Sequence, residues 1–353
     1  MSSQNRKDDH IRINLAEDVE SERVHNGFER YRIRHCPLPE GNLECVDTGT
    51  RFLGRRLTLP LLISSMTGGT DTASRVNRNL AEAAQHRRVA MGVGSQRIMV
   101  EERQAARNWR ALRRAAPDVP LLANLGLVQL NKGFGLAECM QVVEAIEAEA
   151  LILHLNVLQE CVQPEGDTDW TGLLAKLEQV CRELPVPVIV KEVGWGIDGR
   201  TAQRLLAAGV AGIDVAGAGG TSWSEVEMHR AGTRRQQRIA AAFRHWGTPT
   251  AVCLQEVGAV VGDRSAGLDR PLVIASGGVR SPLDILKSLA LGADLAGVAG
   301  PLLRKAVESA EAVVEELEIW GSVLRIAMFC SGCFTVSDVD RRIVVPAEPP
   351  LNG

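Results

Sequence analysis

The sequence has few aromatic residues and no long apolar or basic run, and each shortage argues against a class of protein. Aromatic residues make up 4% of the 353-residue chain, against 45% hydrophobic residues and 34 glycines. Such a balance suits packed parallel strands and helices better than a β-sandwich. A net charge of −3 without a basic block argues against nucleic-acid binding. Because no apolar run reaches membrane-spanning length and the start MSSQNRKDDH is polar, we expect a cytoplasmic protein.

The eight cysteines are scattered along the chain, and we interpret most of them as small buried hydrophobes of a reducing compartment. Only CSGC, Cys330 to Cys333, has the spacing of a zinc or redox pair. No second pair stands at a matching distance, so we expect no metal or redox role there.

From residue 60 onward, short apolar runs alternate with stretches of helical spacing. The runs are PLLISSMTGG, VAMGVGSQR, VPLLANLG, ALILHLN, PVPVIVKEVG, GIDVAGAGGT, PLVIASGGV and LAGVAG. Among the helices, SPLDILKSLALGAD begins with Ser281 as N-cap and Pro282 in the first turn. Eight strand–helix units predict an α/β fold, a (β/α)8 TIM barrel. The stretch Thr250 to Val257 is compatible with either a strand or a helix.

Three further regions complete the predicted organisation. Residues 1–59 are charged and poorly periodic, and we expect an N-terminal arm with short strands that cover the barrel of residues 60–340. A long insertion after the sixth strand, from Gly220 to Arg270, predicts a lid over one barrel end. We expect the Pro-rich tail 341–353 to be disordered.

Polar residues recur where the predicted strands end, which is the face where barrels of this kind carry their active sites. These positions are Ser64–Thr67, Ser95–Arg97, Asn124, His154–Asn156, Lys191, Thr221–Ser222 and Ser276–Gly278. Lys191 closes an apolar strand, so we expect it to meet an anion such as a reduced flavin, unless it reaches solvent at the rim.

Glycines at the same strand ends indicate a phosphate site. Gly277–Gly278 and Ala299–Gly300 follow the last two strands and lead into helices, as in the phosphate cradle of many barrels. The motifs MTGG and GAGGT add backbone donors. Each could be an ordinary tight turn, but together they favour a mononucleotide such as FMN.

Motifs along the chain closely resemble those of the type 2 isopentenyl-diphosphate isomerases, over roughly residues 5 to 330. They are RKDDHI, MTGGT, VGSQR, ANLG, HLNVLQE, PEGD, VIVKEVGWG, AGAGGTSW and IASGG. The resemblance implies an isoprenoid-biosynthesis enzyme that interconverts isopentenyl and dimethylallyl diphosphate with FMN and Mg²⁺. It also implies that the flavin works reduced, with NADPH or NADH as reductant, in a homotetramer or homo-octamer.

The resemblance also assigns residues to these partners. FMN would contact Ser65, Met66, Thr67, Ser95, Asn124, Lys191, Thr221, Gly277, Gly278, Ala299 and Gly300. The substrate would contact Arg6, Lys7, Ser95, Gln96, Arg97 and Gln159, and Glu160 would bind Mg²⁺.

The residues themselves extend this assignment. Alternation along a strand places His154 and Asn156 on one face, toward the diphosphate, although His154 could instead be a core histidine. His10 lies on an arm that could close over the site. One carboxylate suffices for Mg²⁺ when phosphate completes its shell, and Glu165 and Asp167 are rivals to Glu160. We predict that Lys191, His154 and Gln159 are catalytic, with a ring nitrogen of the flavin moving the proton.

Three other functions are alternatives to this one. An FMN-dependent oxidoreductase of the 2-hydroxy-acid oxidase class needs a histidine base late in the barrel, but IASGG is followed by Val279 and Arg280. A nucleotide dehydrogenase would carry a cysteine in the GAGGT loop, where Thr221 and Ser222 stand. A non-catalytic sensor of a phosphorylated metabolite would explain the glycines, but not Lys191 together with the HLN face.

Overall fold

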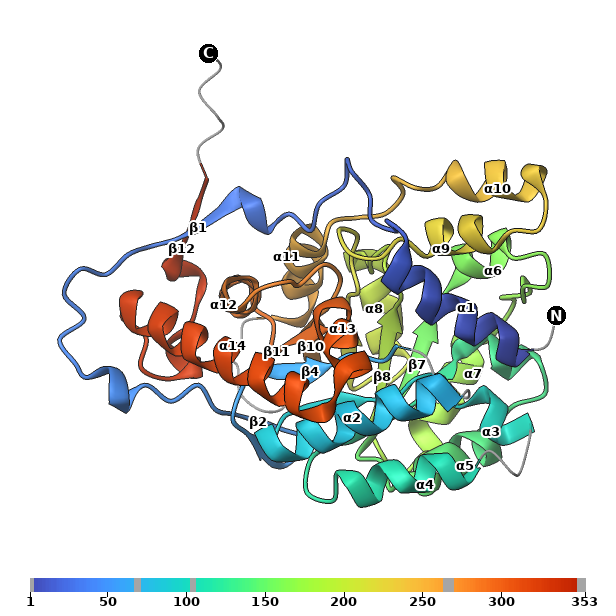
Figure 1. Cartoon of the computed structure of the whole chain (residues 1–353), viewed down its shortest axis with the longest axis horizontal. Helices are drawn as coiled ribbons and strands as arrows, with labels where there is room; N and C mark the ends of the chain where they lie inside the picture. Colours follow the sequence, from blue (N-terminus) through green and yellow to red (C-terminus); the bar gives the residue numbers. More distant parts are fainter. Residues whose placement is uncertain (1–2, 67–70, 102–105, 263–269, 348–353) are drawn as a thin grey trace, which may run out of the picture.

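In the computed structural model, short parallel strands close into a barrel, as the sequence predicts (Figure 1). The structure describes residues 3–66, 71–101, 106–262 and 270–347. The barrel strands are β4 (Leu61–Ile63), β5 (Ala90–Gly92), β6 (Leu121–Gly126), β7 (Ala150–Leu155), β8 (Val188–Glu192), β9 (Gly212–Asp214), β10 (Leu272–Ala275) and β11 (Leu295–Val298). The circle is complete because β11 pairs with β4 and β10 pairs with β9.

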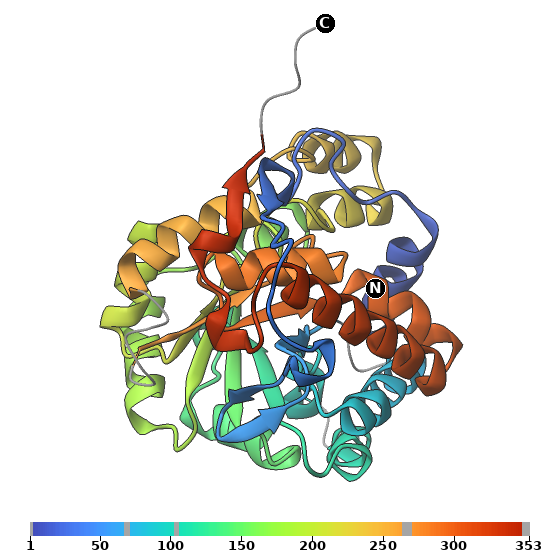
Figure 2. The ribbon, with the colours of Figure 1, turned by 90° about the vertical axis from the view of Figure 1, so that its left-hand side faces the viewer.

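Helices that follow the strands surround the barrel (Figures 1 and 2). The longer ones are α2 (Asp71–Arg87), α4 (Ala106–Ala115), α5 (Leu136–Ala145), α7 (Leu173–Glu183), α8 (Gly199–Ala207), α11 (Thr250–Val261), α12 (Pro282–Ala290), α13 (Gly300–Glu308) and α14 (Ala310–Cys330). Short helices lie at the strand ends: α3 (Arg97–Glu101), α6 (Val157–Val162), α9 (Trp223–Arg230) and α10 (Arg234–Ala241). None of the described helices is long and apolar enough to cross a membrane.

Local capping explains where α12 and α11 begin. The Ser281 side chain accepts a hydrogen bond from the Asp284 N–H, and Pro282 occupies the first turn of α12, as predicted. The ambiguous stretch from Thr250 is helical: α11 starts directly after Pro249 and buries Ala251, Leu254 and Val257.

The N-terminal segment covers both ends of the barrel. Strands β2 (Thr50–Phe52) and β3 (Arg55–Leu57) form an antiparallel hairpin, and their residues Phe52 and Leu57 pack against the barrel interior. At the opposite end lies α1 (Ser3–Ala16), a helix that the poor periodicity of this segment did not predict. Its Ile13 packs with Val226 of α9, so tertiary contacts replace the missing local signal.

The prediction that residues 341–353 are disordered is wrong for the part that the structure describes. Strand β12 (Val344–Pro346) pairs antiparallel with β1 (Tyr31–Ile33) of the N-terminal segment (Figure 2). The prolines hid this strand in the sequence, whereas its valines and the open backbone groups of β1 favour pairing. Residues 348–353 lie outside the described residues.

Candidate active site

The barrel interior changes from apolar to polar between two successive layers of side chains. The apolar layer holds Leu62, Ala90, Leu122, Ile152, Ile189, Ile274 and Leu295, together with Phe52 and Leu57 of the hairpin. Side chains at i and i+2 of a strand share a face, so the next inward positions lie two residues further along. These positions are Ser64, Gly92, Asn124, His154, Lys191, Asp214, Ser276 and Gly297.

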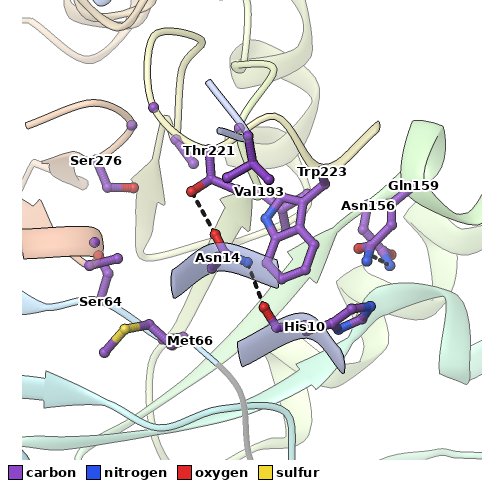
Figure 3. Close-up of a pocket in the computed structure, with 18 of the residues that line it drawn as sticks. His10, Asn14, Ser64, Met66, Asn156, Gln159, Val193, Thr221, Trp223 and Ser276 are labelled. Carbon is purple, nitrogen blue, oxygen red and sulfur yellow. Dashed lines mark hydrogen bonds between the residues drawn. The ribbon is translucent and has the colours of Figure 1, made fainter. Parts of the chain in front are cut away.

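Above this polar layer lies a cavity of about 750 Å³ at the carboxyl ends of the strands. Its size is ordinary for a cofactor or small-molecule site. Helix α1 lies across its mouth, where the Thr221 hydroxyl donates to Asn14 Oδ1 at 3.0 Å (Figure 3). The rings of His10 and Trp223 meet edge to face with centroids 5.0 Å apart. The predicted arm therefore packs over the site as a helix.

The structure brings the predicted FMN residues together. Those that line the cavity are Ser65, Met66, Ser95, Asn124, Lys191, Thr221, Gly277, Gly278, Ala299 and Gly300. Thr67 lies outside the described residues, as do the two glycines of MTGG. Helix α13 begins at Gly300, so its free N–H groups start at the cavity wall.

The glycine loops explain why this wall needs residues without a side chain. Gly277 and Gly278 have φ angles of +99° and +71°, which favour glycine. A Cβ on Gly277 would lie 2.0 Å from the Gly217 carbonyl oxygen, and one on Gly278 would lie 2.4 Å from that of Gly219. The GAGGT glycines thus pack directly against the SGG loop, so they shape the wall as well as exposing backbone groups to the cavity.

Lys191 is buried, with 8% of its surface exposed, and its Nζ donates to the Glu192 carbonyl at 2.5 Å; a buried acid that was not predicted from the sequence lies on the neighbouring strand. The register partner of Lys191 on β9 is Asp214, which is fully buried and accepts a hydrogen bond from the Ser276 hydroxyl at 2.6 Å. Burial raises the pKa of Asp214 even though Lys191 and Ser276 act in the opposite direction. Because Lys191 is buried, the alternative of a lysine side chain that reaches solvent at the barrel rim is wrong. The sequence contained a signal for Asp214, because this residue also lies at the end of a strand.

The residue after Lys191 fixes one wall of the cavity. Glu192 points away from the interior, and its Oε2 accepts hydrogen bonds from the N–H groups of Val193, Gly194 and Trp195 at 2.6–2.7 Å. Burial raises the pKa of Glu192 to about 7 despite these bonds. This carboxyl group thus shapes the loop whose Val193 and Gly194 line the cavity.

His154 lies in the polar layer and lines the cavity. Its Nδ1 hydrogen-bonds Asn124 Oδ1 at 2.9 Å, and Asn124 Nδ2 donates to the Val93 carbonyl at 3.0 Å. A Cβ on Gly126 would stand 3.1 Å from His154 Nε2, so this glycine leaves the ring its space. Asn124 thereby sets the orientation of the imidazole.

Gln96 requires a correction, because it does not line the cavity as predicted. Its side chain is completely buried, with Nε2 donating to the Val142 carbonyl at 3.1 Å and Oε1 accepting from the Asn124 N–H at 3.0 Å. Both polar ends are committed to backbone groups, so Gln96 supports Asn124 rather than a ligand. Its neighbours Ser95 and Arg97 do line the cavity.

The residues that follow β7 form a second polar group at the mouth. Asn156, Gln159 and Glu160 line the cavity. Asn156 Nδ2 donates to Glu160 Oε1 at 2.7 Å, and the Asp167 N–H donates to Glu160 Oε2 at 2.7 Å (Asn156 and Gln159 in Figure 3). Each carboxylate oxygen has a second lone pair, so Glu160 can still bind a cation.

The two rival metal ligands are committed elsewhere. Glu165 accepts from Arg230 at 2.9 Å at the surface. Asp167 is paired with Lys132 at 2.9 Å and Arg97 at 3.3 Å, and it does not line the cavity. Within the described ranges, no three His, Cys, Asp or Glu side chains are grouped as a metal site. Of the three carboxylates, Glu160 is the one that lines the cavity, so it would be available to Mg²⁺ together with phosphate oxygens of a ligand.

Glu227 of α9 connects several predicted residues and was also missed. It is 3% exposed, and its carboxylate contacts His10 at 3.2 Å, Gln159 at 3.1 Å and Arg230 at 2.8 Å. Burial opposes ionisation, but the hydrogen bonds and charges of these partners lower the pKa of Glu227 to about 2. Glu227 thus joins α1 to α6. The side chains of Arg6 and Lys7 lie outside the described part of α1.

Buried polar atoms without partners mark where a cofactor would bind. Among the described residues they include Ser64 Oγ, Ser65 Oγ and Asn156 Oδ1, all from residues that line the cavity. Unpaired buried polar atoms are costly, and a bound ligand removes that cost. Together with the glycine cradle, they fit a phosphorylated cofactor such as FMN.

Comparisons with known proteins agree with this geometry. The model of the FMN-dependent dehydrogenase family matches residues 128–346. An isopentenyl-diphosphate delta-isomerase from Nostoc sp. is 52% identical over 330 residues, which cover 94% of this chain and 92% of the relative. A protein of the same name from Rickettsia rickettsii (strain Sheila Smith) is 47% identical over 334 residues, 95% of each chain.

Solved structures share the fold at low sequence identity. A mandelate oxidase mutant with a monooxide FMN adduct has a TM-score of 0.62 and 21% identity, covering 92% of this chain and 90% of its own. A flavocytochrome b2 mutant with sulfite bound has a TM-score of 0.71 and 16% identity, covering 98% and 85%. These two show the barrel alone. The family model and the sequence relatives show that the chain belongs to the isopentenyl-diphosphate delta-isomerases, built on the barrel of the FMN-dependent dehydrogenases.

Proposed function

We propose that this isomerase interconverts isopentenyl and dimethylallyl diphosphate with bound FMN and Mg²⁺. The observation that carries the proposal is the polar layer: Lys191, Asn124 and His154 converge on one cavity beside a glycine cradle. Relatives that are about half identical over nearly the whole chain bear the name of this reaction. The polar lining and the glycine cradle support binding of a flat phosphorylated cofactor and a diphosphate side by side.

We assign FMN to the side of the cavity formed by β4, β10 and β11. The N–H groups of Gly277, Gly278 and Gly300 would hold its phosphate, and Ser65 and Asn124 would bond to its ring. Lys191 would place a positive charge near the ring, and Asp214 is its register partner on the neighbouring strand. When bound and reduced, FMN supplies an electron-rich ring that stabilises positive charge and a nitrogen that can carry a proton.

We assign the diphosphate to the side formed by α6, α3 and α1. Arg97, His10 and His154 would meet its negative charge, with Arg6 and Lys7 added from α1. Glu160 would hold Mg²⁺, whose remaining ligands would be phosphate oxygens and water. Asn156 keeps the Glu160 carboxylate in place through the 2.7 Å hydrogen bond.

The reaction adds a proton to the terminal methylene and removes another from the allylic carbon, so it needs no net redox change. Gln159 Nε2 donates to the Glu227 carboxylate at 3.1 Å. The amide held in this way would help to orient the proton that is transferred at the alkene. Trp223 and α1 line the cavity mouth and would limit the access of water to a cationic intermediate. The reductant NADPH or NADH, the homotetramer or homo-octamer and the cytoplasmic location stay predictions of the sequence resemblance.

The rival 2-hydroxy-acid oxidase chemistry is less well supported. Among the described residues, the histidines that line the cavity are His10 and His154, from α1 and β7. The β10 loop, where the oxidase base was expected, offers Val279 and Arg280 instead. Arg280 is ion-paired with Glu20 of the N-terminal segment.

The purified protein tests the proposal directly. We expect yellow holoprotein that bleaches under anaerobic NADPH or dithionite. It should then convert isopentenyl diphosphate to dimethylallyl diphosphate without stoichiometric use of reductant. Consumption of one reductant or one O₂ per turnover would establish an oxidoreductase, and a colourless protein that FMN does not reconstitute would establish a sensor.

A further inference from the structure

The turn PEGD, residues 164–167, lies beside the diphosphate side of the cavity and contacts three residues that line it. The Asp167 carboxylate accepts from Arg97 Nη1 and Gln129 Nε2, each at 3.3 Å, and is paired with Lys132 Nζ at 2.9 Å. Its backbone N–H donates to Glu160 Oε2 at 2.7 Å. Asp167 therefore contacts both Arg97 and Glu160, two charged residues that line the cavity.

Backbone packing explains why the turn has this sequence. A Cβ on Gly166 would lie 1.9 Å from the Glu160 carbonyl oxygen and 2.9 Å from its Cα. Only glycine lets the turn approach the backbone of α6 this closely. The close approach carries the Asp167 N–H onto the Glu160 side chain, so Gly166 and Asp167 act as one unit.

The electrostatics favour a role in holding Arg97. The Asp167 side chain is 13% exposed, so its charge is only partly screened by water. Arg97 starts the short helix α3 and also bonds Glu101 at 2.7 Å near the surface. Of these two carboxylates, Asp167 is the more buried, and it lies on the element that also supports Glu160.

We propose that Asp167 is a positioning residue that holds Arg97 and Glu160 together for a magnesium-bound diphosphate. This inference rests on the proposed function and extends it to a residue that does not itself line the cavity. In this proposal Arg97 would bind the phosphate oxygens and Glu160 would bind the metal, so their separation must match that of one magnesium diphosphate. Asp167 sets that separation, since it bonds to both.

The first test measures binding without turnover. Full-length, FMN-loaded protein is titrated with inorganic pyrophosphate and Mg²⁺ in a calorimeter, as wild type, Asp167→Asn and Asp169→Asn. We expect Asp167→Asn to bind about tenfold more weakly, with unchanged FMN content and flavin spectrum. Asp169→Asn is the matched control, because Asp169 is exposed in the same loop and its carboxylate accepts from the nearby Thr171 N–H at 3.0 Å.

The second test separates positioning from folding by kinetics and a double mutant. Asp167→Asn should raise KM for isopentenyl diphosphate about tenfold and change kcat less than about threefold. In an Arg97→Gln background, Asp167→Asn should raise KM by less than about threefold, because the arginine that Asp167 is proposed to position is already lost. If Asp167→Asn fails to load FMN, Asp167→Glu replaces it, with an expected rise in KM of about threefold from displaced Arg97.

The outcomes distinguish this inference from the function on which it rests. Wild-type holoprotein that neither binds magnesium pyrophosphate nor isomerises the substrate would overturn the proposed function itself. An active wild type with Asp167→Asn indistinguishable from Asp169→Asn would overturn only the positioning role. Equal effects of Asp167→Asn in the wild-type and Arg97→Gln backgrounds would do the same.

Discussion

At the amino end of the barrel, the inward side chains are leucine, isoleucine and alanine, covered by Phe52 and Leu57 of the β2–β3 hairpin. Two residues further along the same strands, the inward positions carry serine, asparagine, histidine, lysine and aspartate. The first layer has no polar side chain to satisfy, whereas the second contains two buried ionisable groups, Lys191 and Asp214. The contrast teaches that stability and chemistry are divided between adjacent layers, so substitutions in each should have separable effects.

The largest expected effect is on the apolar layer. Phe52→Ala should lower the free energy of unfolding by about 4 kcal/mol, because removal of a fully buried aromatic ring leaves a cavity at the amino end of the barrel. Denaturant unfolding measures the loss. Folded Phe52→Ala should still bind FMN as wild type does. Leu38→Ala, at a side chain that is 73% exposed, is the control and should change little. A large loss of FMN affinity in folded Phe52→Ala would show that the layers are not separable.

The converse substitution is in the polar layer. Lys191→Met keeps the volume and removes the charge, and it should lower kcat/KM about a hundredfold, or about 3 kcal/mol of transition-state stabilisation. The unfolding free energy should change by less than about 1 kcal/mol, because Asp214 can take up a proton. Steady-state kinetics with anaerobic reduced enzyme measures the first effect. Normal turnover by Lys191→Met would contradict the role assigned to this lysine.

A smaller effect concerns pH and the contact between α1 and α9. The pKa of Glu227 is about 2 in the folded state, against an ordinary value of 4.5. A lowered pKa stabilises the fold above about pH 4.5, and that contribution is lost as the pH falls toward 2. Between pH 7 and pH 3 we expect a loss of about 2 kcal/mol.

Glu227→Gln isolates this contribution. The gap in unfolding free energy between wild type and Glu227→Gln should narrow by the same amount over that pH range. Denaturant unfolding at each pH measures it. A gap that does not vary with pH would mean that the carboxylate does not stabilise the closed arrangement of α1.

The smallest effect is expected at the CSGC segment, away from both layers. Cys333 is buried, and its Sγ donates weakly to the Ser331 and Asp338 carbonyls. Cys330 is half-buried at the end of α14. Cys330→Ser should change stability by less than about 0.5 kcal/mol and leave activity unchanged. Zinc analysis of the purified protein should find no bound metal, and stoichiometric zinc would reverse our interpretation of the motif.

Much of the fold and part of the site followed from local pattern. Apolar runs and helical spacing predicted the strands and the order of the barrel, and the polar strand ends predicted the cavity that Lys191 and Asn124 line. Gln96 was assigned wrongly because it adjoins two residues that do line the cavity, while its own side chain turns into the backbone around Asn124. Asp214 and Glu227 were missed because the role of each depends on a neighbour from another element, Lys191 of β8 or His10 of α1.

The sequence by itself determined the barrel fold, the barrel end that carries the candidate site, and the family. Strand alternation, helix periodicity and motif order are local properties of the sequence, so they can be read without the structure. Only the tertiary structure decided which charges meet. His10 contacts Glu227 although the two residues are 217 positions apart in the sequence. Strand β12, near the end of the chain, pairs with β1 of the N-terminal segment. Such pairs depend on the closure of the barrel and on the register of its strands, and no local pattern carries that information.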